Sequence, residues 1–300
     1  HQPRRQRQMC IRDSSKDEDV LVFGEDVGYF GGVFRTTDGL QEKHGAHRVF
    51  DTPLSEGGIA AIAFGMGLNG LKPVCEIQFA DYIFPAYDQI VNEIAKLRHR
   101  SGGEFWTPIT IRTPAGGGIR GGHHHSQSPE SQFTHTPGLK VVYSSTPYNA
   151  KGLLISAIES EDPVIVFEPK RCYRGPFYGD PHKVPTWSGH AEAEVPDVHY
   201  TVPIGEARLV NEGNDCTVIA WGTMVHVCEE GIRQSGASCD LIDLQSLIPW
   251  DREAVVRSVK KTGRCVIVHE APKTSGYGAE MAASVQERCF WSLEAPVTRV

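Results

Sequence analysis

Short apolar runs alternate with amphipathic segments from residue 20 onward, and this alternation predicts strands and helices in turn. The apolar runs predict strands at 20–23, 48–50, 74–79, 109–112, 140–143 and 164–168. Helical periodicity predicts helices between them at 57–68, 86–100 and 147–158. Thr146 suits the cap of the last helix and Pro147 its first turn. Such alternation indicates a largely parallel sheet covered by helices on both faces.

A second alternation follows, with strands predicted at 216–220, 239–244 and 265–269 and helices near 225–234, 252–261 and 279–289. A last strand is only begun at 295–300, so this second domain is expected to be cut short at its end. Residues 174–202 are rich in Pro, Gly, His and Trp without a clear period, which indicates a linker. The sequence therefore predicts two α/β domains of three layers each, at 20–173 and 203–300.

The first 19 residues differ from the rest, because they carry four arginines and no apolar period. Such a segment is typical of a targeting presequence, and a fragment end or a sequence-assembly artefact would give the same pattern. We assign this segment no function.

Composition narrows the class of protein. With 40% hydrophobic and 22% charged residues, the 300-residue chain reads as a soluble globular protein of two domains. A net charge of -7 argues against a nucleic-acid-binding surface, and no apolar run approaches the roughly 20 residues of a membrane helix. The eight cysteines form no C-x-x-C pair and several fall in apolar strands, which favours buried free thiols in a reducing compartment.

Glu56 is the most informative residue, because it lies where a predicted strand gives way to a helix rich in glycine and alanine. Ser55 can cap this helix, and an acid in the first turn suits its dipole. Capping does not explain the small residues that follow, since each interior glycine costs about 1 kcal/mol relative to alanine. A helix with so little bulk lets a ligand or another backbone approach the carboxylate closely.

Two glycine-rich segments, 65–70 and 116–121, spell the G-x-G-x-x-G dinucleotide fingerprint without its strand-to-helix context, so dinucleotide binding is disfavoured. His123, His124 and His125 follow the second segment. In an extended chain only His123 and His125 would share a face, which disfavours a metal site. A loop histidine here fits an acid-base or oxyanion-binding group better, with a plain surface histidine as the alternative.

Tyr82 comes directly after a predicted buried strand, at the carboxyl end where ligands gather in parallel sheets. A core or interface aromatic is an equally good interpretation.

Several long segments resemble one family. They are Gly24-Glu25-Asp26-Val27, Thr52-Pro53-Leu54-Ser55-Glu56, Glu76-Ile77-Gln78-Phe79-Ala80-Asp81-Tyr82-Ile83-Phe84-Pro85-Ala86, His125-Ser126-Gln127-Ser128-Pro129-Glu130 and Pro137-Gly138-Leu139-Lys140-Val141-Val142. The chain resembles the beta subunits of thiamine-diphosphate-dependent 2-oxoacid dehydrogenases, most of all the bacterial form of the branched-chain (2-oxoisovalerate, EC 1.2.4.4-like) decarboxylase component. The resemblance runs from about residue 20 to residue 300 and implies the pyrimidine-binding and C-terminal domains of the transketolase family.

The resemblance also implies roles for individual residues. Glu56 would hydrogen-bond N1' of the aminopyrimidine of thiamine diphosphate, and His125 would orient the 2-oxoacid and assist acyl transfer to lipoamide. Tyr82 would pack on the pyrimidine, with Leu54 and Gln78 in the same pocket. Because the chain has no Gly-Asp-Gly segment, the ligands of Mg2+ and of the diphosphate are expected on an alpha subunit in an alpha2-beta2 assembly.

Other expectations follow from the same resemblance. Potassium could bind carbonyl groups of Ile109, Ala157, Ile158 and Asp162, although Ser160 replaces an acidic residue. A dihydrolipoyl acyltransferase would be a further partner, and the compartment would be the bacterial cytoplasm or, in a eukaryote, the mitochondrial matrix. The alternatives are a pyruvate or acetoin dehydrogenase beta subunit and, in another class, a non-catalytic scaffold subunit.

Overall fold

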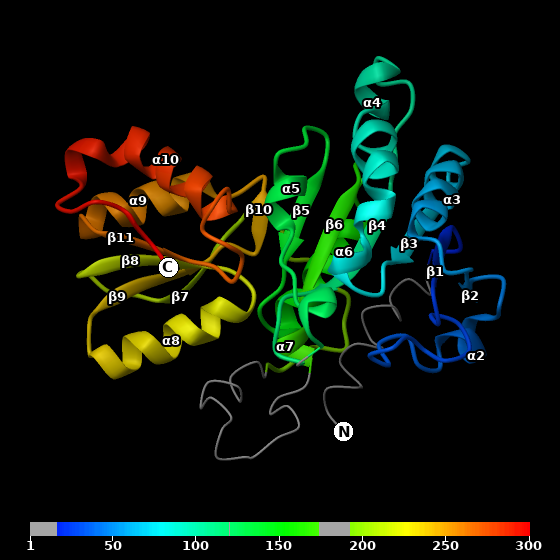
Figure 1. The fold of residues 1–300 in the computed structure, drawn as a ribbon, viewed down its shortest axis with the longest axis horizontal. Coiled ribbons are helices and arrows are strands. Elements are labelled where there is room, and N and C mark those ends of the chain that lie inside the picture. The colour runs from blue at the N-terminus through cyan, green and yellow to red at the C-terminus, as the bar shows by residue number, and fades with distance from the viewer. Residues whose placement is uncertain (1–16, 120, 174–192) are drawn as a thin grey trace.

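The structure is a computed structural model that describes residues 17–119, 121–173 and 193–300. Within these residues, seven strands form one sheet in the order β10-β5-β6-β4-β3-β1-β2 (Figure 1). Their bounds are β1 (Val20–Gly24), β2 (Val49–Asp51), β3 (Lys72–Glu76), β4 (Thr110–Ala115), β5 (Lys140–Tyr143), β6 (Val164–Pro169) and β10 (Ser246–Ile248). All neighbours are parallel except β10, which runs antiparallel to β5.

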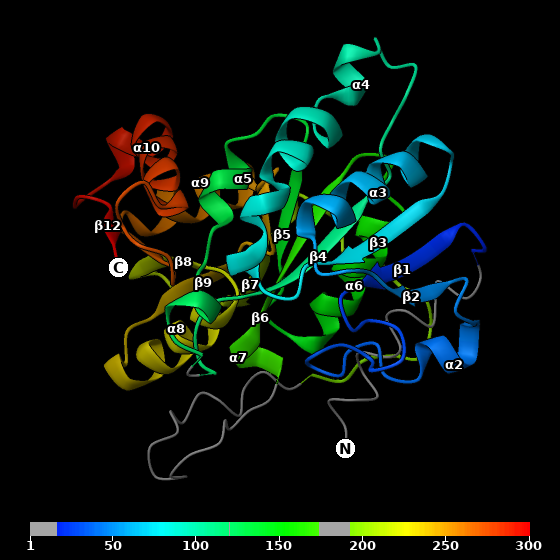
Figure 2. The ribbon, with the colours of Figure 1, turned by 45° about the vertical axis from the view of Figure 1, so that its right-hand side comes forward.

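Helices cover both faces of this sheet because successive side chains of its buried strands point to opposite sides. On β3, Cys75 packs in the core that contains Ile59 of one helix, whereas Val74 packs in the core that contains Leu153 of another. The first face carries α3 (Glu56–Leu68), a π-helix η4 (Gln89–Ile94), α4 (Leu97–Arg100) and α5 (Glu130–Thr134). The second face carries α2 (Leu40–His44) and α6 (Pro147–Ile158), and α7 (Lys170–Tyr173) follows β6 (Figure 2).

The second domain repeats this plan on a smaller scale. Its described strands lie in the order β12-β11-β8-β9-β7, and only β7 is antiparallel to its neighbour. The bounds are β7 (Arg208–Asn211), β8 (Cys216–Ala220), β9 (Cys239–Asp243), β11 (Cys265–Val268) and β12 (Thr298–Arg299). In Figure 1, α8 (Thr223–Ser235) covers one face, and α9 (Arg252–Thr262) and α10 (Tyr277–Cys289) cover the other. Both domains thus have the three layers that the sequence predicts.

The predicted helix at 86–100 is the clearest difference from the sequence prediction. Two 3-10 turns, η2 (Ala80–Tyr82) and η3 (Phe84–Ala86), lead into this segment, which consists of the π-helix η4 and the short α4 in place of one α-helix. Ile90 and Ile94 face the core as the periodicity predicts, so the apolar pattern is satisfied although the hydrogen bonds are not those of one α-helix. The strands β7 and β10 were also not predicted, because each is a short antiparallel addition to an otherwise parallel sheet.

The strand β10 belongs in sequence to the second half of the chain but in space to the first sheet. Ser246 pairs with Val142 and Ile248 with Val141. Trp221 and Leu247 lie in the same core as Tyr143 and Phe167. The two domains therefore share one continuous apolar core.

Most of the predicted linker, 174–192, lies outside the described residues, as does most of the arginine-rich segment. The rest of the linker contacts α6 through Lys151. The buried ammonium of this residue donates hydrogen bonds to the carbonyls of Pro196 and Val198 at 2.7 and 2.8 Å. Among the described cysteines none is in a disulfide, and Cys75, Cys228 and Cys265 are buried. No helix in the described ranges has the length and apolar character needed to cross a bilayer.

Candidate active site

The motif residues of the first domain gather at the carboxyl ends of β1, β2, β3 and β4. Glu25 follows β1, the turn 52–55 follows β2, Gln78 follows β3 and Gly116 follows β4. These strands are neighbours in the sheet, so their carboxyl ends meet at one edge. Ligands bind at this edge in parallel α/β sheets.

Glu56 opens α3 as the sequence predicts. The Ser55 hydroxyl accepts a hydrogen bond from Gly58 N at 3.3 Å, so Ser55 and not Glu56 caps the helix. The Glu56 side chain is partly exposed and accepts no hydrogen bond from the described residues. Gly57 lets the helix lie against the next segment, because a Cβ there would stand 3.1 Å from the Pro85 carbonyl oxygen. The carboxylate of Glu56 is therefore available to a ligand.

Glu25 is a second carboxyl group of this site, and sequence reasoning did not assign it a role. It is buried at the end of β1, and within the described residues its Oε1 atom has no hydrogen-bond partner. Burial raises its pKa, and the charges of Glu56 and Asp26 raise it further. A negative charge close to a buried carboxyl group favours its protonated form.

Tyr82 and His125 come together although 43 residues separate them in sequence. The Tyr82 hydroxyl lies 2.9 Å from His125 Nε2, and His125 Nδ1 lies 2.9 Å from the Gly121 carbonyl oxygen. A carbonyl oxygen only accepts, so Nδ1 carries a proton, and in the neutral ring Nε2 accepts from Tyr82. Phe79 packs edge-on against the imidazole with centroids 4.5 Å apart. The two contacts fix both the orientation and the tautomer of His125.

The triple histidine is not extended, so the assumption behind the face-sharing argument was wrong. His123, His124 and His125 form one 3-10 turn, in which the rings of His123 and His124 lie 3.8 Å apart. Only His125 turns toward Tyr82. Across the described parts of the chain, no three His, Cys, Asp or Glu residues are grouped to hold a metal ion.

Gln78 and Leu54 lie on the outer side of the site. The Gln78 amide donates to Asp26 Oδ2 at 2.8 Å, which ties the residue after β3 to the loop after β1. Leu54 is 82% exposed, so within this chain it lines no closed pocket. In the loop that follows β1, the side chains of Tyr29 and Phe30 are also exposed, Tyr29 to 91%.

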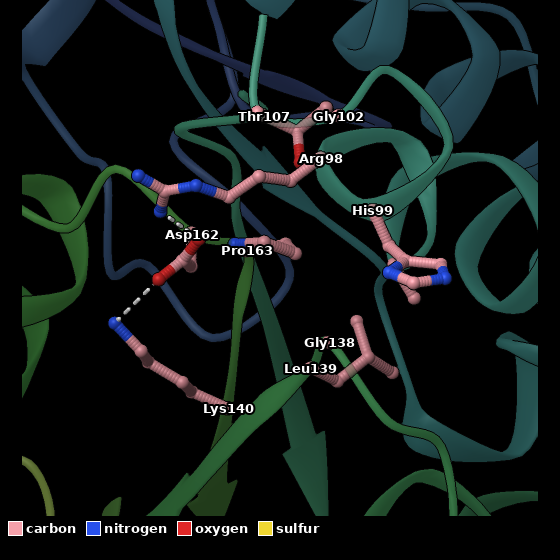
Figure 3. A pocket seen from close by; sticks show the side chains of 11 residues that line it. Arg98, His99, Gly102, Thr107, Gly138, Leu139, Lys140, Asp162 and Pro163 are labelled. Carbon is pink, nitrogen blue, oxygen red and sulfur yellow. Dashed lines mark hydrogen bonds and ion pairs between the residues drawn. The ribbon is translucent and has the colours of Figure 1, made fainter. Parts of the chain in front are cut away.

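The four residues considered for potassium lie at the opposite, amino end of the sheet. The Ile109 carbonyl accepts from Val164 N, and the Ala157 carbonyl accepts from Ser160 N. A cavity of about 520 Å³ opens beside Asp162 (Figure 3). Arg98 and Lys140 both reach the Asp162 carboxylate there. Burial opposes ionisation of Asp162, but the hydrogen bonds from these two cations outweigh it and lower its pKa.

Glu130 is a buried acid that follows the triple histidine in the sequence. It opens α5, and the indole nitrogen of Trp221, from the second domain, donates to its Oε1 at 3.2 Å. Burial raises its pKa from 4.5 to about 7. The folded protein therefore retains a proton that the unfolded chain loses between these values.

The pH dependence of stability should change when Glu130 is replaced by glutamine. As pH rises through the window from 4.5 to about 7, the parent protein should lose up to about 3 kcal/mol of unfolding free energy, because the unfolded state releases the proton first. Glu130→Gln lacks this loss, so its stability relative to the parent should increase with pH. Urea unfolding at intervals across the window measures this, with the exposed Glu280→Gln as control. Parallel profiles for parent and Glu130→Gln would contradict the prediction.

Residues 10–176 match the family model described as transketolase, pyrimidine binding domain, and residues 205–300 match transketolase, C-terminal domain. A solved structure described as a split gene transketolase, inactive beta4 tetramer, superposes with a TM-score of 0.73 at 21% identity. It covers 98% of this chain and 86% of its own. The fold and the site thus define a protein of the transketolase type, with both the pyrimidine-binding and the C-terminal domain.

Relatives among characterised proteins narrow the family. The chain is 57% identical to 2-oxoisovalerate dehydrogenase subunit beta of Pseudomonas aeruginosa, over 95% of this chain and 82% of that protein. The mitochondrial subunit of Dictyostelium discoideum is also 57% identical, with 95% and 74% covered. A pyruvate dehydrogenase E1 beta subunit from Acholeplasma laidlawii is 47% identical, over 95% of this chain and 83% of that one. The chain belongs to the family of 2-oxoisovalerate dehydrogenase beta subunits.

Proposed function

We propose that this chain is the beta subunit of an enzyme that decarboxylates branched-chain 2-oxoacids of the 2-oxoisovalerate type on thiamine diphosphate. The acyl group then passes to lipoamide of a dihydrolipoyl acyltransferase partner. The observation that carries the proposal is the pair Glu56 and Glu25, two carboxyl groups at the carboxyl edge of the sheet that have unused hydrogen-bonding capacity. Higher identity to 2-oxoisovalerate than to pyruvate dehydrogenase subunits supports the branched-chain substrate.

The residues present fit the aminopyrimidine half of this cofactor. Glu56 would hold a proton against N1', and the glycines at the start of α3 leave room for a flat ring beside the carboxylate. Tyr82 and His125 already hydrogen-bond each other, so Tyr82 would hold the imidazole where His125 can orient the 2-oxoacid. When bound, thiamine diphosphate supplies the nucleophile and the electron sink for decarboxylation.

The other half of the site would come from an alpha subunit in an alpha2-beta2 assembly. The sequence has no Gly-Asp-Gly segment, so the ligands of Mg2+ and of the diphosphate would lie on that subunit. Apolar side chains uncovered around the Glu56 segment, namely Tyr29, Phe30, Leu54 and Ile62, support a partner surface there.

The proposal includes a potassium site at the amino end of the first sheet. Ile109 and Ala157 offer carbonyl oxygens whose second lone pairs can coordinate a cation. Beside Ile109, the buried Thr110 hydroxyl has no hydrogen-bond partner within the described residues. Because Arg98 and Lys140 neutralise the Asp162 carboxylate, Asp162 would contribute its carbonyl at most. A melting temperature that is equal in KCl and NaCl of the same ionic strength would count against this site.

One experiment tests the catalytic proposal. The chain is co-expressed with its alpha subunit, and decarboxylation of 2-oxoisovalerate and of pyruvate is measured with thiamine diphosphate and Mg2+. We expect a higher kcat/KM for 2-oxoisovalerate. Faster turnover of pyruvate would assign the chain to the pyruvate enzymes, and no turnover of either 2-oxoacid by an intact assembly would favour the scaffold alternative.

A further inference from the structure

The loop that carries His125 is held at both of its ends by carboxylate groups. It leaves β4 at Gly116 and returns at Gln127, whose carbonyl accepts a hydrogen bond from Gly116 N at 2.8 Å. At the returning end, Asp81 Oδ1 accepts from Ser126 N at 3.1 Å and from Gln127 N at 3.2 Å. His125 is therefore directly followed by two residues whose backbone positions one acid fixes.

At the leaving end the acid comes from the second domain. Glu270 lies two residues past the end of β11, and its Oε1 accepts from Gly117 N at 2.6 Å. The contact requires glycine at 116, because φ there is +77° and a Cβ would stand 2.6 Å from Glu270 Oε2. A charged acceptor makes such a hydrogen bond stronger than one between neutral groups.

A buried lysine lies against the aromatic ring that packs on the histidine. Lys170 has no exposed surface, and its ammonium donates to the Pro114 carbonyl oxygen at 3.4 Å. It also faces the Phe79 ring at 5.6 Å from the centroid, the ring that packs against His125. Burial lowers the pKa of Lys170 to about 8, and the charges of Asp81 and Glu270 oppose that shift. The charges of both carboxylates that hold the loop thus act on the buried lysine.

We propose that Glu270 and Asp81, with Lys170 as their shared counter-charge, are positioning residues that place His125 in the active site. The second domain would thereby take part in the reaction through Glu270, although the residues proposed above to contact the cofactor all lie in the first domain. The expected effect on turnover rests on the proposed function. The expected effect on the order of the loop does not.

Hydrogen exchange in the full chain, assembled with its alpha subunit, tests the structural part. Glu270→Ala removes the acceptor of Gly117 N, and Glu270→Gln keeps an oxygen acceptor but removes the charge. We expect amide exchange in peptides covering 116–119 and 121–127 to rise about tenfold in Glu270→Ala and less in Glu270→Gln. Glu280→Ala is the matched control, since Glu280 lines the same cleft between the domains as Glu270. It should leave this exchange unchanged.

Kinetics with 2-oxoisovalerate tests the catalytic part. In Glu270→Ala we expect kcat to fall about tenfold or more, while the affinity for thiamine diphosphate stays unchanged, because misplacing one catalytic group slows the reaction without removing cofactor contacts. Lys170→Met should raise loop exchange at both ends.

Three outcomes would overturn the inference. Equal loop exchange in Glu270→Ala and Glu280→Ala would remove Glu270 from this role, and unchanged exchange in Lys170→Met would remove the lysine. Exchange that rises equally through β8, β9 and β11 would show a loosened domain in place of a local clamp. If the parent assembly turns over no 2-oxoacid, the proposed function fails. The exchange comparison still shows whether Glu270 holds the loop that carries His125.

Discussion

Replacement of Glu56 by glutamine is expected to lower the turnover of 2-oxoacid by about 100-fold or more. Glutamine has nearly the same size, so α3 and its Ser55 cap should remain as they are. What the substitution removes is a carboxyl group that can hold or release a proton beside Glu25. The measurement is kcat of the assembled enzyme at saturating thiamine diphosphate, together with the melting temperature as a check of folding.

A matched control separates this role from an effect on the helix dipole. Glu253 is also an acid in the first turn of a helix, α9, whose cap is the Asp251 carboxylate. Because Glu253 lies in the second domain and is exposed, Glu253→Gln should leave kcat unchanged. Near-normal turnover in Glu56→Gln would show that Glu56 acts only as a favourable charge in the first turn of α3.

Replacement of Arg112 by methionine should destabilise the fold by about 3 to 5 kcal/mol, because it removes a buried cation that hydrogen-bonds two buried carboxylates. Arg112 on β4 donates from Nε and Nη2 to the two carboxylate oxygens of Glu168, at 3.0 and 2.7 Å, and it also bonds Glu76. Burial raises the pKa of Glu76, and the positive charge of Arg112 opposes that rise. Urea unfolding at neutral pH measures the loss.

An exposed ion pair supplies the comparison for this prediction. Arg100 pairs with Glu93 on the surface, with 48% and 35% of the two side chains exposed. Pairs of this kind contribute little to stability, so Arg100→Met should leave the unfolding midpoint unchanged within error. If Arg112→Met behaved like Arg100→Met, the buried contacts of Arg112 with Glu76 and Glu168 would not be a determinant of stability.

Local signals in the sequence predicted the bounds of several helices and strands. The helix α6 begins and ends where Thr146, Pro147 and the apolar period place it, and β5 and β8 have their predicted bounds. The prediction of one α-helix at 86–100 was wrong about the hydrogen bonds of this segment. Its apolar period is compatible both with an α-helix and with the observed mixture of α- and π-helix. The strand β10 could not be predicted, because its pairing with β5 spans about 100 residues and depends on the assembled sheet.

The candidate site also has parts that the sequence predicted and parts that it did not. Glu56 was found from the unusual sequence around it, and its place at the first turn of α3 is confirmed. The contact between Tyr82 and His125 was not predicted, because it needs a turn that brings the imidazole back over the strand edge. Glu25 and Glu270 gave a weaker signal, namely an acid within two residues of the end of a strand, which becomes informative only when the neighbouring strands are known.

The place of β10 in the first sheet has a consequence for synthesis of the chain. Until residue 248 has left the ribosome, the edge of β5 has no partner, although β1 to β6 are already complete. An open strand edge of a half-made sheet invites pairing with other chains. Between the ends of β6 and β10, about 80 residues of synthesis leave this edge open and favour aggregation of the nascent chain.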